Sequence, residues 1–197
     1  MQEFHIAIID DEPDLHAAIK LALRHQKILG NNLIIHSAYS KQEGMALINQ
    51  QPELALIFLD VVMETNKAGF ELLQVVRELD LKVQPQVIIL TGQPGNLTAT
   101  EATEKYDINA YLTKTELTTN KLYSLLTTSL RTHQQIKQIA TVTRDLEQAK
   151  NQHIQTIDLL NQAENLANVG GWLYDLDQQQ LELTNGAKLI QASCNKA

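Results

Sequence analysis

"AIIDDEPDLH", residues 7–16, opens with three apolar residues and then becomes acidic at Asp10, Asp11 and Glu12. The apolar part is typical of a buried strand, and Pro13 suits the first turn of a helix that follows it. Adjacent like charges cost free energy unless a positive charge lies among them. The stretch therefore predicts a strand that delivers carboxylates to a cation, with Glu12 expected to be a loop residue.

Short apolar runs alternate with stretches of helical spacing along the first two-thirds of the chain. The runs lie at Phe4–Ile9, Leu33–His36, Leu54–Leu59, Val87–Leu90 and Ala110–Leu112. Such alternation predicts βαβ units and a parallel sheet. The nearly all-apolar run at 54–60 is typical of a central strand covered on both faces. We predict an α/β fold, a flavodoxin-like doubly wound sheet of five parallel strands with five helices, ending near residue 131.

Composition excludes several classes of protein. With 197 residues, 44% of them hydrophobic, the chain suits a packed soluble domain. No apolar run approaches the roughly 20 residues of a membrane span, and the N-terminus lacks the features of a signal peptide. A single cysteine, Cys194, excludes an internal disulfide and fits a reducing cytoplasm. The net charge of −7 argues against non-specific binding of nucleic acid.

Carboxylates are expected to converge at one edge of this sheet, because ligands sit at the carboxyl ends of parallel strands. Asp10 and Asp11 end the first strand, and Asp60 ends the third, which is its neighbour in a flavodoxin-like order. Hard oxygen ligands of this kind suit Mg²⁺. The simpler alternative is that Asp10 and Asp11 cap the next helix, which needs only one of them. Thr91 and Lys114 close the fourth and fifth strands and add a hydroxyl and a cation.

Residues 1–131 resemble the receiver domain of two-component response regulators. The residues that match in order and spacing are Asp10, Asp11, Asp60, Thr91, Tyr111 and Lys114. Three positions depart from the family pattern: Glu64 replaces a proline, Gly69 comes one residue late, and no proline follows Lys114. The phrases "DVVMETNKAG", "LTGQPG" and "KTELT" resemble a receiver variant found ahead of larger modules such as HD-GYP phosphodiesterase regions.

The resemblance implies a phosphoacceptor that is not an enzyme beyond autophosphorylation and autodephosphorylation. A sensor histidine kinase or phosphotransfer protein would donate a phosphoryl group to Asp60. Mg²⁺ would be held by Asp11, Asp60 and the Val62 backbone carbonyl, with Asp10 acting through a metal-bound water. Lys114 would pair with the phosphoryl oxygens.

The resemblance also assigns a switch to two further residues. Thr91 would donate its hydroxyl to the phosphoryl group, and Tyr111 would then turn inward and alter the outer surface of the domain. The alternative is a degenerate receiver that acts as a phosphorylation-independent dimerisation or binding module.

Other classes fit less well. An aspartate-based phosphatase needs a second Asp where Val62 stands. A flavin site needs a Ser/Thr/Gly-rich phosphate loop, whereas "DDEPD" is acidic. A histidine kinase is also a poor fit, because no Gly-rich ATP lid is present.

Residues 132–167 predict a helical linker between domains. Its seam positions recur every seven residues, at Ile139, Leu146, His153, Leu160 and Ala167, with a second set at Val142, Ala149, Thr156 and Ala163. The pattern fits either a solvated helix with a narrow apolar stripe or a parallel dimeric coiled coil, and we favour the coiled coil and a homodimer.

Residues 168–197 predict a strand, a polar turn and a second strand. The stretch "LNQAENLANVGGWLYDLDQQQLELTNGA" (160–187) is similar to the opening of a PAS sensory domain, with Gly170, Gly171, Trp172 and Asp175 as the telling residues. The alternative is an unrelated amphipathic hairpin that packs its tryptophan.

Overall fold

The computed structural model describes residues 3–92, 106–167, 169–175 and 178–194. The chain divides into two compact units, Met1–Ala140 and Thr141–Ala197. None of the helices in these described ranges is long and apolar enough to cross a membrane.

A five-stranded parallel sheet organises the N-terminal unit. Its strands are β1 (Glu3–Ile9), β2 (Asn32–Ala38), β3 (Leu54–Asp60), β4 (Gln86–Thr91) and β5 (Ala110–Thr113). They pair in the order β2-β1-β3-β4-β5. Every residue of β3 is buried, as its apolar run predicts for a central strand. The predicted flavodoxin-like sheet is confirmed.

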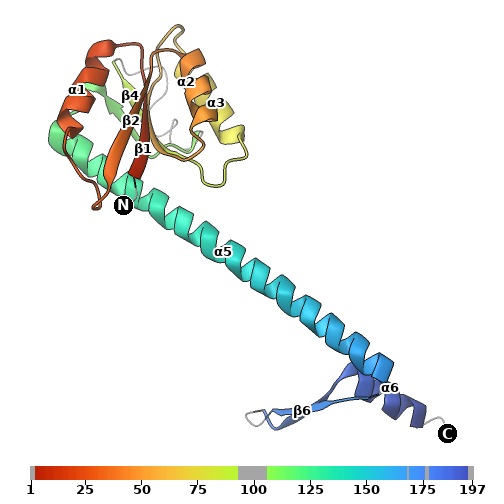
Figure 1. Ribbon diagram of the computed structural model, residues 1–197. Helices are drawn as coiled ribbons and strands as arrows, with labels where there is room; N and C mark the ends of the chain where they lie inside the picture. The colour runs from red at the N-terminus through yellow and green to blue at the C-terminus, as the bar shows by residue number, and fades with distance from the viewer. Residues whose placement is uncertain (1–2, 93–105, 168, 176–177, 195–197) are drawn as a thin grey trace. The chain divides into compact units, whose positions relative to one another are not determined.

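Helices cover both faces of this sheet. They are α1 (Pro13–Leu23), α2 (Lys41–Gln50), α3 (Ala68–Glu78) and the first turns of α5 (Thr119–Ala167). A short 3-10 helix, η1 (Lys114–Glu116), follows β5. Figure 1 shows α1 and the start of α5 on one face, and α2 and α3 on the other. The predicted fourth helix falls between β4 and β5, where residues 93–105 lie outside the described part of the chain.

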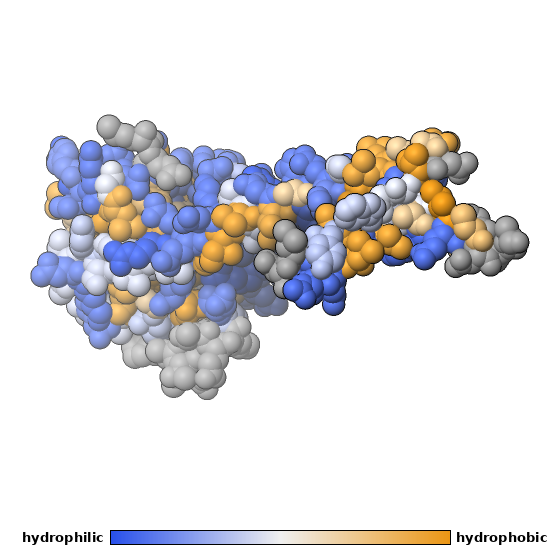
Figure 2. Space-filling view, turned by 90° about the horizontal axis from the view of Figure 1, so that it is seen from below, coloured by the Kyte–Doolittle hydropathy of each residue, from blue (hydrophilic) through white to orange (hydrophobic). Residues whose placement is uncertain are grey.

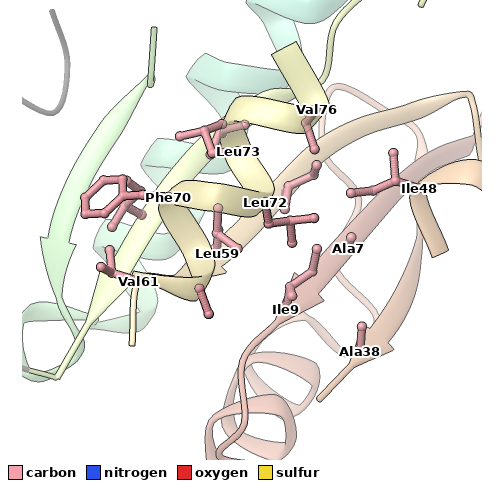
Figure 3. Packing of buried hydrophobic residues seen from close by; sticks show 14 of the residues in the cluster. Ala7, Ile9, Ala38, Ile48, Leu59, Val61, Phe70, Leu72, Leu73 and Val76 are labelled. Carbon is pink, nitrogen blue, oxygen red and sulfur yellow. The ribbon is translucent and has the colours of Figure 1, made fainter. Parts of the chain in front are cut away.

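The sheet faces bury two separate apolar clusters. One packs β1, β3 and β4 against α2 and α3, and Figure 3 shows its side chains meeting between the strands and α3. The other packs the opposite faces of the same strands against α1 and the first turns of α5, through Ile19, Leu122 and Leu126. The alternation of side chains along each strand therefore supplies both cores.

A glycine brings α3 close to the end of β3. A Cβ at Gly69 would collide with the carbonyl oxygen of Asp60, and the Gly69 N–H donates to the Val61 carbonyl at 3.1 Å. Only a residue without a side chain fits this approach. The late position of the glycine, a departure from the receiver pattern, is therefore the one that this β3–α3 connection requires.

The C-terminal unit consists of the second part of α5, an antiparallel hairpin and a last helix. The hairpin joins β6 (Trp172–Asp175) to β7 (Gln180–Leu183), and α6 spans Asn185–Cys194. The long helix and the hairpin were predicted, and both are confirmed. Helix α6 was not predicted. Figure 2 shows apolar residues gathered on the visible surface of this unit, and Trp172 is 71% exposed.

Candidate functional site

Asp10 lies at the carboxyl end of β1 and is 1% exposed. Its N–H donates to the Ala38 carbonyl of β2 at 3.1 Å. Its Oδ1 accepts a hydrogen bond from the Glu12 N–H at 2.9 Å, which bends the chain towards α1. The helix itself begins without a side-chain cap. Asp10 therefore shapes the turn before α1, but its carboxylate does not cap that helix.

Asp60 is the last residue of β3 and is 3% exposed. Its Oδ1 accepts a hydrogen bond from the Val62 N–H at 3.1 Å. Its Oδ2 lies 2.6 Å from Nζ of Lys114. The parallel pairing of β1 with β3 brings Asp60 to the same edge as Asp10. Two buried carboxylates thus meet at the end of the sheet, as the sequence predicts.

Lys114 joins three carboxylates. Its Nζ lies 2.9 Å from Asp10 Oδ2, 2.9 Å from Glu12 Oε1 and 2.6 Å from Asp60 Oδ2. Its side chain is 11% exposed. Burial alone lowers the pKa of Lys114, but its hydrogen bonds to the carboxylates outweigh burial and raise the pKa above its ordinary value. Lys114 therefore stays charged and holds the three acidic side chains together.

A capping box fixes the backbone around Lys114. The Thr113 side chain accepts from the backbone of η1, and Glu116 Oε2 accepts from the Thr113 N–H at 3.1 Å. These reciprocal bonds define the turn that follows β5. These bonds hold the segment around Lys114, which lacks the proline of the receiver pattern.

The electrostatics of the site favour an additional cation. Burial raises the pKa of Asp10 to about 6. Burial also raises the pKa of Asp60, although its hydrogen bond to Lys114 opposes the shift and the charge of Asp11 adds to it. A single ammonium faces several carboxylates, so the ionised site carries an excess of negative charge. A bound divalent cation would offset that excess.

The chemistry of these residues fits Mg²⁺. One carboxylate oxygen from each of Asp10, Glu12 and Asp60 lies within 4.8 Å of the others. Asp10 Oδ2 is buried and has no hydrogen-bond partner in the described part of the chain, although it lies at ion-pair distance from Lys114. Carboxylate oxygens are the ligands that Mg²⁺ takes in proteins. The acidic cluster is therefore a suitable magnesium site.

The other predicted site residues lie around this cluster. Thr91 ends β4, is 1% exposed and pairs in register with Thr113, next to Lys114. Tyr111 is half-buried and packs against the apolar cluster between the sheet and helices α2 and α3. Asp11 is exposed and contributes no oxygen to the group of three. Val62 is 37% exposed. Metal binding by Asp11 and the Val62 carbonyl stays a prediction.

Sequence reasoning missed two residues beside the site. Glu12, expected to be a loop residue, contacts Lys114, because the turn at Asp10 directs its side chain back to the site. His16 is 2% exposed, and its Nε2 lies 2.8 Å from the Asp10 carbonyl oxygen. Burial lowers the pKa of His16. A signal was present, since His16, Ile19 and Leu23 share the buried face of α1 at helical spacing.

Comparison with known proteins agrees with this arrangement. The profile of the response regulator receiver domain matches residues 6–127. Over 131 residues, 66% of the chain, the sequence is 34% identical to the 3'3'-cGAMP-specific phosphodiesterase 2 of Vibrio cholerae serotype O1. The aligned part makes up 25% of that relative's length.

Solved structures share the fold of the N-terminal unit. The signal receiver domain of an HD domain-containing protein from Pseudomonas fluorescens Pf-5 is 19% identical, with a TM-score of 0.57, covering 68% of this chain and 99% of that one. A CheY-like receiver domain protein from Methanospirillum hungatei JF-1 is also 19% identical, with a TM-score of 0.53, covering 66% and 97%. At such identity they show the fold alone. Because the receiver profile spans more than half of the sequence, the chain belongs to the response regulator receiver family.

Proposed function

We propose that the chain is a phosphoacceptor receiver, in which Asp60 accepts a phosphoryl group from the phosphohistidine of a sensor histidine kinase or phosphotransfer protein. The observation that carries this proposal is the contact between Asp60 Oδ2 and Lys114 Nζ at 2.6 Å, at the buried end of a central strand. A structural ion pair needs one acid, whereas Lys114 contacts three. The surplus of acids supports a site built for a cation and a phosphoryl group.

The proposed transfer is a displacement at phosphorus. An ionised oxygen of Asp60 attacks the phosphorus atom, and the bond from phosphorus to the histidine nitrogen breaks. The electron pair of that bond stays on the leaving imidazole, and Asp60 becomes an acyl phosphate. Such transfers depend on positioning and on charge neutralisation more than on covalent help from the protein. Lys114 supplies a buried positive charge for the phosphoryl oxygens.

Asp10 and Asp60 are proposed to hold Mg²⁺, together with Asp11 and the Val62 carbonyl, and Glu12 is a further candidate ligand. When bound, Mg²⁺ neutralises the negative charge of the phosphoryl group. The chain's own residues prepare the site, because the Val62 N–H fixes one oxygen of Asp60 and Lys114 orients the other. The raised pKa of Asp10 fits a carboxylate that is most stable in the ionised form with a cation beside it.

Thr91 and Tyr111 are proposed as the switch. Thr91 is buried at the end of β4, one strand away from Lys114. Its hydroxyl would donate to the phosphoryl group, and Tyr111, half-buried on β5, would move further inward. This change would alter the balance between two packings of the domain surface.

The signal is proposed to reach a C-terminal signalling module through α5. In this proposal residues 132–167 pair with a second copy as a parallel coiled coil, and residues 168–197 begin a PAS-like domain. The exposure of the seam supports it, since Ile139, Val142 and Leu146 are 65%, 60% and 68% exposed. A Leu146→Cys variant, with Cys194 replaced, should form cross-linked dimers, and their amount should change when an acyl-phosphate mimic is added. An unchanged yield would count against this coupling.

We also propose that the chain is cytoplasmic and turns over no external substrate beyond its own phosphorylation and dephosphorylation. The phosphoacceptor role is tested by incubating the protein with Mg²⁺ and acetyl phosphate, followed by intact mass spectrometry. The wild type should gain the mass of one phosphoryl group, and Asp60→Asn should gain none. Asp145→Asn, which alters an exposed aspartate on α5, is the matched control and should behave as the wild type. A wild type that forms no adduct and binds no beryllofluoride would instead indicate the degenerate receiver.

A further inference from the structure

The backbone of Asp10 is held on both sides. Its N–H donates to the Ala38 carbonyl of β2 at 3.1 Å, and its carbonyl oxygen lies 2.8 Å from Nε2 of His16 on α1. Its side-chain Oδ1 is engaged by the Glu12 N–H at 2.9 Å. These bonds leave Oδ2 as the oxygen of Asp10 that has no hydrogen bond in the described part of the chain. Oδ2, which lies 2.9 Å from Lys114 Nζ, is thus presented by a residue whose other polar atoms are hydrogen-bonded.

His16 links this turn to the neighbouring strand. Its Nε2 must be the donor to Asp10, because a carbonyl oxygen only accepts. Its Nδ1 lies 2.9 Å from the Ser37 hydroxyl on β2, which completes a line of hydrogen bonds from Ser37 through the imidazole to Asp10. The Tyr39 ring stacks on the imidazole, with 4.3 Å between centroids. The imidazole itself is buried, at 2% exposure.

We propose that His16 is a positioning residue for cation binding. Through its bond to the Asp10 carbonyl it holds the turn after β1, so that Asp10 Oδ2 faces Lys114 and the other carboxylates. This inference rests on the proposed function for the identity of the cation, Mg²⁺. His16 does not touch the reacting atoms and acts through Asp10.

Packing alone does not explain a histidine at this position. An apolar side chain would fill the space between α1 and the sheet, as Ile19 and Leu23 do on the same face. A buried imidazole is favourable only where both of its nitrogens find partners, because an unpaired buried polar group costs free energy. Here the two partners belong to the metal-binding turn and to the strand beside it. Outer partners of metal ligands set metal affinity in this way.

Two amide variants separate the bond to Asp10 from the bond to Ser37. The longer side chain of His16→Gln carries an N–H to the position of Nε2 and keeps the donor to Asp10. The shorter side chain of His16→Asn reaches the position of Nδ1 and keeps only the contact with Ser37. Mg²⁺ affinity is measured by isothermal titration calorimetry on the whole chain without any phosphoryl donor. Thermal unfolding without metal shows that each variant is folded.

We expect His16→Asn to weaken Mg²⁺ binding by about tenfold or more, and His16→Gln to bind Mg²⁺ nearly as the wild type does. Ser37→Ala removes the hydrogen bond to Nδ1 of His16, and its Mg²⁺ affinity should lie between those of the two His16 variants. It replaces His16→Asn in the comparison if that variant does not fold. Equal affinities in all the variants would overturn the inference, and so would an equal loss in His16→Gln and His16→Asn. A wild type without Mg²⁺ affinity would overturn it as well.

The same titration separates the inference from the proposed function. A wild type that binds Mg²⁺ but forms no phosphoryl adduct contradicts the phosphoacceptor role of Asp60. It leaves the comparison of the His16 variants intact, because their readout is metal affinity. If the adduct forms and the His16→Asn and Ser37→Ala variants bind Mg²⁺ as tightly as the wild type, the function stands and the positioning role of His16 is refuted.

Discussion

The N-terminal unit buries most of its apolar strand residues, whereas the C-terminal unit leaves large apolar side chains exposed. In Met1–Ala140, apolar residues of β1, β3 and β4 are buried on both faces of the sheet. In Thr141–Ala197, Trp172, Leu181 and Leu189 are 71%, 59% and 61% exposed. A two-stranded hairpin cannot bury its apolar face by itself. Among the described residues, the first unit therefore buries its apolar strand residues against its own helices, whereas the second leaves large apolar side chains exposed.

The largest expected effect is the loss of stability when one leucine in each unit is shortened to alanine. Leu56 is 0% exposed, so Leu56→Ala leaves a cavity in the core. The variant should lower the free energy of unfolding by about 2–5 kcal/mol. Leu181→Ala removes the same atoms from a side chain that is 59% exposed, and should change it by no more than about 0.5 kcal/mol. Urea denaturation followed by far-ultraviolet circular dichroism measures both. Similar losses in the two variants would break the comparison.

The next effect concerns the buried carboxylate of Asp10. Burial raises its pKa from 3.8 to about 6 in the folded state, so the folded protein binds a proton more tightly than the unfolded chain does. Stability without metal should therefore fall as the pH rises from about 4 to about 6, and Asp10 contributes a cost of up to about 3 kcal/mol above that range. The isosteric change Asp10→Asn removes this cost while its amide oxygen can still accept from the Glu12 N–H.

Asp10→Asn should consequently be more stable than the wild type at pH 8 without Mg²⁺, with the difference shrinking towards pH 4. Denaturant midpoints across this pH range, read in the presence of a chelator, provide the measurement. Glu182→Gln, on the exposed hairpin of the second unit, removes one carboxylate without a buried site and is the matched control. A variant that is less stable than the wild type at pH 8 would contradict this account of the site.

The smallest effect is a spectroscopic one. Trp172 is the one tryptophan of the chain, so its fluorescence reports on the C-terminal unit alone. Its 71% exposure predicts the emission of a water-exposed indole at low protein concentration, with little shift on adding urea. If a second copy covers the apolar face, emission should move to shorter wavelength as the concentration rises. Emission typical of a buried indole at the lowest concentration would contradict the exposure of Trp172.

Much of the receiver could be predicted because its central strands β1, β3 and β4 are mostly buried and rich in apolar residues. Such runs identify the sheet, and the polar residue that ends each run identifies the edge where Asp10, Asp60 and Lys114 meet. The side-chain directions in the turn after β1 could not be predicted. There the hydrogen bond from the Glu12 N–H to the Asp10 side chain shapes the turn, so that Glu12 lies beside Lys114 while Asp11 is exposed.

His16 was missed for a related reason, since its partners come from β2 and from the turn, which lie beside α1 only once the sheet has formed. Helix α6 was missed because it is short and begins with Asn185 and Gly186, which are weak helix formers. The α5 seam was read from its heptad spacing, and pairing with a second copy remains a prediction.

The central claim is that Asp60 carries the phosphoryl group. The most direct measurement treats the acetyl phosphate-modified protein with borohydride, which reduces an acyl phosphate to an alcohol, and then locates the product by peptide mass spectrometry. Our account predicts homoserine at position 60 in the wild type, formed only when phosphoryl donor and Mg²⁺ are both present. Unmodified Asp60 throughout, or homoserine at another aspartate, would contradict it.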